Sequence, residues 1–265
     1  MNIQLPPTTE LLAACDCVDN LIEHYLSAIG KGRVQLGRFE AEIEAYTLQK
    51  LIIRYSEAVL LMARHDMVLL PSAHVAARAC FETHVKVLWL LKPTNPFERE
   101  ARWIAHLNSA SEHWGKLEKN DFIEEWMRPT LTNQKKIFLD FSDAIAAKLI
   151  AEGYHVDDKI PTLWGMLKDI GAPELYPYYI ILSAYTHSNF EAASLYRKNL
   201  GCGKKLGEFI SVNDWAFPID VVWKSLFLCA RSVLLLVEAP DSSFDQEFLI
   251  NDFKSKSEKL KKLPR

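Results

Sequence analysis

The chain has 265 residues, of which 49% are hydrophobic and 25% are charged, and its formal net charge at pH 7 is −3. This composition is typical of a folded globular protein, and it excludes the globally basic surface of proteins that hold DNA mainly by charge. The composition does not exclude a basic groove on one part of the surface. Five cysteines, an odd number without paired metal-ligand spacing, predict a chain without a disulfide framework and favour the reducing cytoplasm.

Helical periodicity and cap residues predict an all-α protein, a single-domain multi-helix bundle that covers residues 1–265. The predicted helices span about residues 8–30, 38–70, 71–93, 95–120, 124–127, 129–153, 161–171, 173–200 and 213–240. Glycine or proline ends most of them, since neither residue continues a helix well. Residues 254–265 form a lysine-rich tail that we expect to fray.

No membrane segment and no metal site are predicted. The first residues lack the pattern of a secretory signal, and the most apolar late stretch, residues 221–237, contains Lys224 and Arg231, which are costly in a bilayer. Glu152 and His155 have the Glu-x-x-His spacing of helical carboxylate sites, but this spacing occurs once, whereas di-metal bundles need two copies. We therefore expect no membrane partner, no metal and no cofactor.

A polar stripe marks the very apolar helix predicted between Pro71 and Pro93. Its members recur every four residues and are His74, Arg78, Glu82 and Lys86. Four residues on an α-helix turn the side chain by only about 40°, so these groups share one face. Arg78 offers a planar fork that suits a phosphate or a carboxylate, and Glu82 can orient it. The alternative interpretation is an ion pair that only stabilises the packing of the helices.

A second polar cluster lies in the helix predicted over residues 173–200. Its side chains that can bind a substrate are Ser183, Tyr185 and Asn189. Ser183, His187 and Glu191 fall at i, i+4 and i+8, so on a continuous helix they share a face, and His187 can act as general acid or base with Glu191 fixing its tautomer. The alternative is a buried structural histidine that a neighbouring helix satisfies. Arg231, on an apolar late helix, is a further candidate phosphate contact.

Two short motifs carry a resemblance to a known family. Arg78-Ala79-Cys80-Phe81-Glu82 looks like the Arg-x-x-(Leu/Phe)-Glu helix of a widespread bacterial family of uncharacterised helical proteins, and residues 182–189 resemble that family's Ser-x-x-x-His element. The family has been associated with HEPN-like helical bundles, so the resemblance implies a HEPN-like core with extra helices. Members of that superfamily often cleave RNA without a metal, using an arginine and a histidine at a dimer interface.

The resemblance assigns roles to two residues and matches two more without a role. Arg78 would hold the phosphate and His84 would transfer the proton, while Glu82 and His187 match the narrower family. It implies a cytoplasmic homodimer that acts on RNA as a metal-independent endoribonuclease, in phage defence or as a toxin with a regulatory protein partner. The alternative hypotheses are a non-catalytic binding or scaffold protein, whose Arg-Glu-His cluster is structural or binds a small anion, and a helical enzyme that acts on a small phosphate compound.

Overall fold

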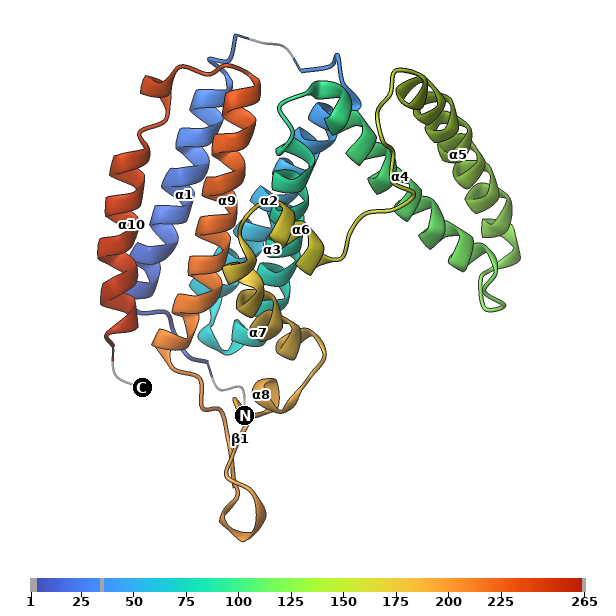
Figure 1. The fold of residues 1–265 in the computed structure, drawn as a ribbon. Helices are drawn as coiled ribbons and strands as arrows, with labels where there is room; N and C mark the ends of the chain where they lie inside the picture. Colours follow the sequence, from blue (N-terminus) through green and yellow to red (C-terminus); the bar gives the residue numbers. More distant parts are fainter. Residues whose placement is uncertain (1–3, 34–35, 264–265) are drawn as a thin grey trace.

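The computed structural model describes residues 4–33 and 36–263, and α-helices make up most of this part of the chain (Figure 1). The predicted all-α multi-helix bundle is confirmed. The helices are α1 (Thr9–Ile29), α2 (Glu40–His65), α3 (Leu70–Leu91), α4 (Pro96–Glu118), α5 (Arg128–Ala151), α6 (Leu163–Asp169), α7 (Tyr176–Thr186), α8 (Phe190–Ala193), α9 (Ala216–Leu236) and α10 (Gln246–Lys261). Strands β1 (Arg197–Lys198) and β2 (Lys205–Leu206) form a two-stranded antiparallel sheet.

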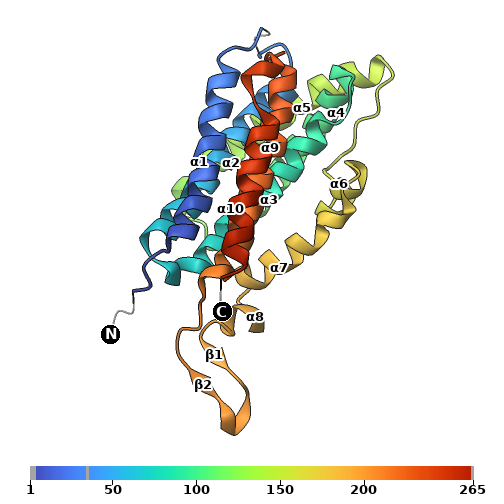
Figure 2. The ribbon, with the colours of Figure 1, turned by 90° about the vertical axis from the view of Figure 1, so that its left-hand side faces the viewer.

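The core lies among five long helices, α1, α2, α3, α9 and α10 (Figures 1 and 2). Helix α9 is in the middle and contacts the other four, so it is buried on most of its faces. Just before α9, the fully buried Trp215 donates its indole N–H to the carbonyl of Met67 at 3.1 Å. Trp223 of α9 stacks on Phe253 of α10 with ring centroids 4.4 Å apart. These large aromatic side chains join the start of α9 to the segment before α3, and the middle of α9 to α10.

Helix α3 is the element on which the candidate site is built, and its two sides have different neighbours. On one side it packs against α2 and α9, and on another it meets α6 and α7. Because His74 lies beside Phe217 and His84 beside Ser225, α3 and α9 run in the same direction. The α3 side chains that face α9 are core residues. Toward α7, His74 and Phe81 are buried as well, whereas Arg78 and Glu82 are only partly buried.

Two hairpins project from this body. Helices α4 and α5 form one, which leans away from the bundle in Figure 1. Strands β1 and β2 form the other, which extends beyond α8 at the opposite end (Figures 1 and 2). Within residues 4–33 and 36–263, no helix combines the length and apolarity that crossing a membrane requires.

The prediction of one continuous helix over residues 173–200 is wrong, because α7 ends at Thr186 and the chain changes direction there. Ser188 adopts a left-handed conformation with φ of 52°, and the amide of Asn189 donates to the carbonyl of Ala184 at 2.9 Å. This 6→1 bond, with the amide of Ser188 bound to Tyr185, is the Schellman arrangement that ends helices, usually with glycine at the left-handed position. Because a serine occupies that position instead of glycine, the sequence does not indicate that the helix ends here.

Two further helix boundaries differ from the predictions. The helix predicted to reach residue 70 ends at His65, since the carboxylate of Asp66 accepts the amides of Leu5 and Val68 and holds its own backbone extended. The tail expected to fray from residue 254 is helical through Lys261, because α10 packs against α1 and buries Leu260.

Candidate functional site

Arg78 is the centre of a polar cluster between α3 and α7. Its Nε donates to Oε1 of Glu82 at 2.6 Å, and its Nη1 lies 3.3 Å from Nε2 of His187. Its Nη2 donates to the hydroxyl of Tyr179 at 3.4 Å, and the guanidinium carbon is 5.1 Å from the centre of that ring. We call Arg78, Glu82, Tyr179 and His187 the Arg78 cluster. The structure thus brings together a guanidinium, a carboxylate and an imidazole from segments about 100 positions apart.

The members of the Arg78 cluster differ in exposure. The Arg78 side chain is 15% exposed and that of Glu82 is 38% exposed, while His187 lies at the surface. A guanidinium has no acceptor, so Nη1 can donate to Nε2 of His187 only while that nitrogen carries no proton. In this contact the guanidinium is therefore the hydrogen-bond donor and the imidazole is the acceptor.

The end of α7 determines where His187 lies. Tyr179, Ser183 and His187 are spaced by four residues, so they follow one face of α7 toward α3, and His187 is the C-cap residue. Ser183 does not offer a free hydroxyl, since its Oγ donates to the carbonyl of Tyr179 at 2.7 Å. Glu191 lies beyond the break after Thr186, so the predicted shared face with His187 is wrong.

His84 is not brought to Arg78. Six helical residues separate the two by about 120° around the axis, and His84 is buried where α3 packs on α9. Its Nδ1 lies 3.2 Å from Oγ of Ser225, and its Nε2 has no hydrogen-bond partner among the residues that the structure describes. Burial lowers the pKa of His84 to about 4. The resemblance favours His84 as the proton-transfer group, but the structure places this histidine in the core, where it is neutral.

Tyr185 and Asn189 also lie apart from the Arg78 contacts. Tyr185 stacks on the buried His74 with ring centroids 3.8 Å apart, and burial, followed by the charges of Asp214 and Glu191, raises the pKa of its hydroxyl. The ring of His74 donates to the carbonyl of Leu70 at 2.9 Å, and burial lowers its pKa to about 4. Asn189 is exposed and is the residue before α8. The predicted stripe on α3 thus has a buried end at His74 and a half-buried end at Lys86.

Arg231 faces a different part of the surface. Its guanidinium carbon is 5.9 Å from the ring centre of Phe227, and its side chain lines a pocket of about 180 Å³ with Asp241 and Phe244. No residue of the Arg78 cluster lines that pocket. The structure therefore separates Arg231 from the phosphate-binding set that the sequence proposed.

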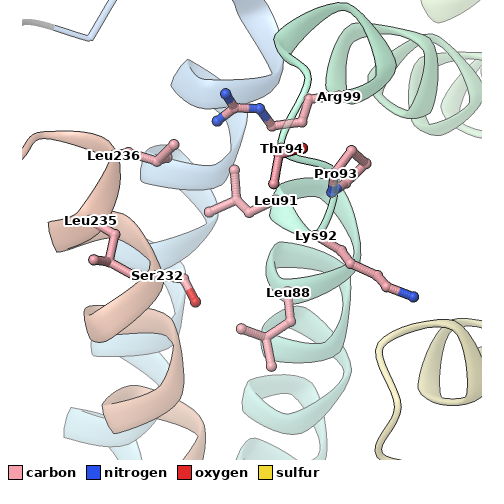
Figure 3. A pocket seen from close by; sticks show the side chains of 9 residues that line it. All are labelled: Leu88, Leu91, Lys92, Pro93, Thr94, Arg99, Ser232, Leu235 and Leu236. Carbon is pink, nitrogen blue, oxygen red and sulfur yellow. The ribbon is translucent and has the colours of Figure 1, made fainter.

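A pocket that the sequence did not predict lies where α3, α4 and α9 meet (Figure 3). Its volume is about 430 Å³, and leucines from α3 and α9 form much of its wall. Arg99 extends across one end in Figure 3, and its guanidinium forms an ion pair with Glu42 at 3.2 Å. The charge of Arg99 is thus balanced inside the protein, which leaves a largely apolar hollow.

Tyr179 is the member of the Arg78 cluster that sequence reasoning missed. The signal was present, because Tyr179 precedes Ser183 and His187 by one and two steps of four residues on a helix. Among the residues that the structure describes, no group of three or more His, Cys, Asp or Glu side chains is arranged to hold a metal ion.

Comparison with known proteins places the chain in one family. A family model described as a family of unknown function, DUF5677, matches residues 44–204, which is more than half of the chain. The matched range runs from α2 to the turn between β1 and β2, and it contains all four residues of the Arg78 cluster. No curated protein and no solved structure matches the chain.

Proposed function

The chain belongs to this family of unknown function, and we propose from its chemistry that the Arg78 cluster is the active site of a metal-independent endoribonuclease. The observation that carries the proposal is the 3.3 Å contact between the guanidinium of Arg78 and the imidazole of the exposed His187. RNA cleavage without a metal needs a cation for the phosphate and a group that moves protons, and these two side chains supply both.

The chemistry assigns one role to each side chain. Arg78 holds a phosphate with its two terminal nitrogens, while Glu82 fixes its Nε. His187 takes the proton from a ribose 2′-hydroxyl, whose oxygen then attacks the adjacent phosphorus. The bond from phosphorus to the 5′-oxygen breaks, and the imidazolium returns the proton to that oxygen. The products are a 2′,3′-cyclic phosphate and a 5′-hydroxyl, so atoms and charges balance without an added reagent.

The wider setting of the proposal rests on the resemblance of the two motifs. It includes a HEPN-like relationship, a homodimer, a regulatory protein partner, a cytoplasmic location and a role in phage defence or as a toxin. In this proposal His187 replaces His84 as the proton-transfer group, since His84 contacts the core side chain Ser225.

The test is cleavage of a fluorescently labelled single-stranded RNA by the purified protein in the presence of EDTA. We expect the wild type to form products that end in a 2′,3′-cyclic phosphate, and we expect Arg78→Ala and His187→Ala to lose at least about 100-fold in rate. Matched controls are Arg54→Ala and His155→Ala, which remove an exposed arginine and an exposed histidine elsewhere. A wild type that leaves RNA intact, or controls that lose as much as the cluster variants, would contradict the proposal.

A second candidate function is favoured by the burial of Arg78. Its side chain is 15% exposed and already bound to Glu82, which suits a structural ion pair or a site for a small anion. This candidate predicts that Arg78→Ala lowers the unfolding temperature through the unpaired carboxylate of Glu82, and that RNA stays uncleaved by the wild type. Thermal unfolding of the same variants, with and without inorganic phosphate, separates the two functions.

A further inference from the structure

The hairpin that projects beyond α8 has a charge opposite to that of the protein as a whole. Residues 196–209, which we call the basic hairpin, contain four cationic side chains and one carboxylate, that of Glu208. The cations are Arg197, Lys198, Lys204 and Lys205, and all four are exposed. The hairpin therefore has a formal charge of +3, although the whole chain has −3. This is the local basic surface that the overall composition left open.

The pairing of the strands places like charges opposite each other. Lys198 pairs with Lys205 across the antiparallel sheet, where side chains directly opposite start about 5 Å apart. In the described part of the chain, none of the four cations has a carboxylate within ion-pair distance. Like charges in this position destabilise a sheet, so the bare hairpin has an electrostatic cost that a bound anion removes.

Hydrogen bonds at the base of the hairpin fix it next to α8. The amide of Phe209 donates to the carbonyl of the buried Leu195 at 2.8 Å, and the amide of Gly207 donates to the carbonyl of Tyr196 at 3.1 Å. The one-turn helix α8 separates these strands from His187 at the end of α7 (Figure 2). Apolar side chains stand next to the cations, since Tyr196 is 42% exposed and Leu206 is 76% exposed.

We propose that the basic hairpin binds single-stranded RNA and directs it to the Arg78 cluster. This inference rests on the proposed ribonuclease function and deepens it. The cations contact successive phosphates of one strand, and the exposed Tyr196 offers a face on which a base can stack. An unpaired strand suits this surface better than a duplex, because its bases are free to contact the apolar side chains between the cations.

The test is binding of a labelled 2′-O-methyl RNA, which lacks the nucleophile for cleavage, measured by fluorescence anisotropy at several salt concentrations. We compare the full-length wild type with Lys198→Gln/Lys205→Gln and with Lys254→Gln/Lys259→Gln, a matched control on the exposed side of α10. Each lost phosphate contact lowers the slope of log affinity against log salt by about 0.7, so the hairpin variant should lose about 1.4. We expect its affinity to fall on the order of tenfold, with the α10 control unchanged.

A second variant guards against a folding defect. Lys198→Glu places a carboxylate opposite Lys205, so it should leave the unfolding temperature equal or higher while it weakens RNA binding. Unchanged RNA binding in both hairpin variants would overturn the inference, and so would binding to anionic lipid vesicles with no binding to RNA. Hairpin-dependent binding by a wild type that cleaves no RNA would reject the ribonuclease alone. Cleavage that depends on Arg78 but not on the hairpin would reject the hairpin alone.

Discussion

Helix α3 carries a polar side chain toward α9 and another toward α7, and the two differ in burial and in their partners. Toward α9, His84 is 2% exposed and contacts the hydroxyl of Ser225. Toward α7, Arg78 meets the exposed His187 across two helices. Burial lowers the pKa of His84 to about 4, so it stays neutral and holds its place in the packing. His84 is therefore a poorer candidate for proton transfer than His187, which comes from another helix and lies at the surface.

The largest expected difference between the two sides is in stability. His84→Ala should lower the free energy of unfolding by about 2–4 kcal/mol, because it opens a cavity at a buried position and leaves the hydroxyl of Ser225 without its partner. His187→Ala should cost less than about 0.5 kcal/mol, since its side chain is exposed. Urea unfolding measures both. Equal losses in the two variants would show that the two sides of α3 do not differ as the packing indicates.

A smaller effect is expected in the pH dependence of stability. An unfolded histidine has a pKa of about 6.5, whereas burial lowers the pKa of His84 to about 4, so between these values only the unfolded chain binds the proton. Stability from this group is therefore present at neutral pH and is lost as the pH falls through about 6.5 toward 4. Between pH 7 and 5 the loss is about 2 kcal/mol for one such histidine, and His74 adds a similar contribution.

The variant His84→Gln isolates that contribution, because it removes the titrating ring and keeps a polar side chain. Its stability curve should fall less than that of the wild type between pH 7 and 5, by up to about 2 kcal/mol. Chemical unfolding at each pH gives the two curves. Parallel curves would mean that His84 does not titrate differently in the folded and unfolded chains.

The smallest effect concerns the ion pair toward α7. Glu82→Gln should cost about 1 kcal/mol, because Arg78 is largely buried and loses a charged acceptor at 2.6 Å. Glu57→Gln is the matched control, since its partner Arg54 is 74% exposed, and such surface pairs contribute less than about 1 kcal/mol. Thermal unfolding compares the two substitutions. A larger loss for Glu57→Gln would contradict the difference in burial on which the Arg78 cluster depends.

Most of the fold follows from the sequence, because apolar residues at helical spacing and glycine or proline at the ends are local signals. The predicted multi-helix bundle is therefore confirmed, and so is a helix with Arg78 and Glu82 on one face. The failures have tertiary or unusual local causes. Ser188 replaces the glycine that would have marked the end of α7, and Asp66 ends α2 by hydrogen bonds that include one to Leu5, which lies 61 positions away.

The candidate site was predictable in part. The four-residue spacing identified Arg78 and Glu82, and the polar run after residue 182 identified His187. Their meeting depends on how α7 lies across α3, which spacing along the chain does not encode. The same limit explains why the sequence grouped His84 and Arg231 with Arg78, whereas packing assigns His84 to the core and Arg231 to a separate pocket.

Chemical rescue is the sharpest test of whether His187 transfers the proton. In EDTA, we expect His187→Ala to cleave single-stranded RNA at least about 100-fold more slowly than the wild type and to regain rate when imidazole is added. Arg78→Ala should not respond to imidazole, because its missing group holds the phosphate and does not transfer the proton. If imidazole leaves His187→Ala inactive, or if the substitution of His187 does not slow cleavage at all, His187 is not the proton-transfer group and the proposed mechanism is contradicted.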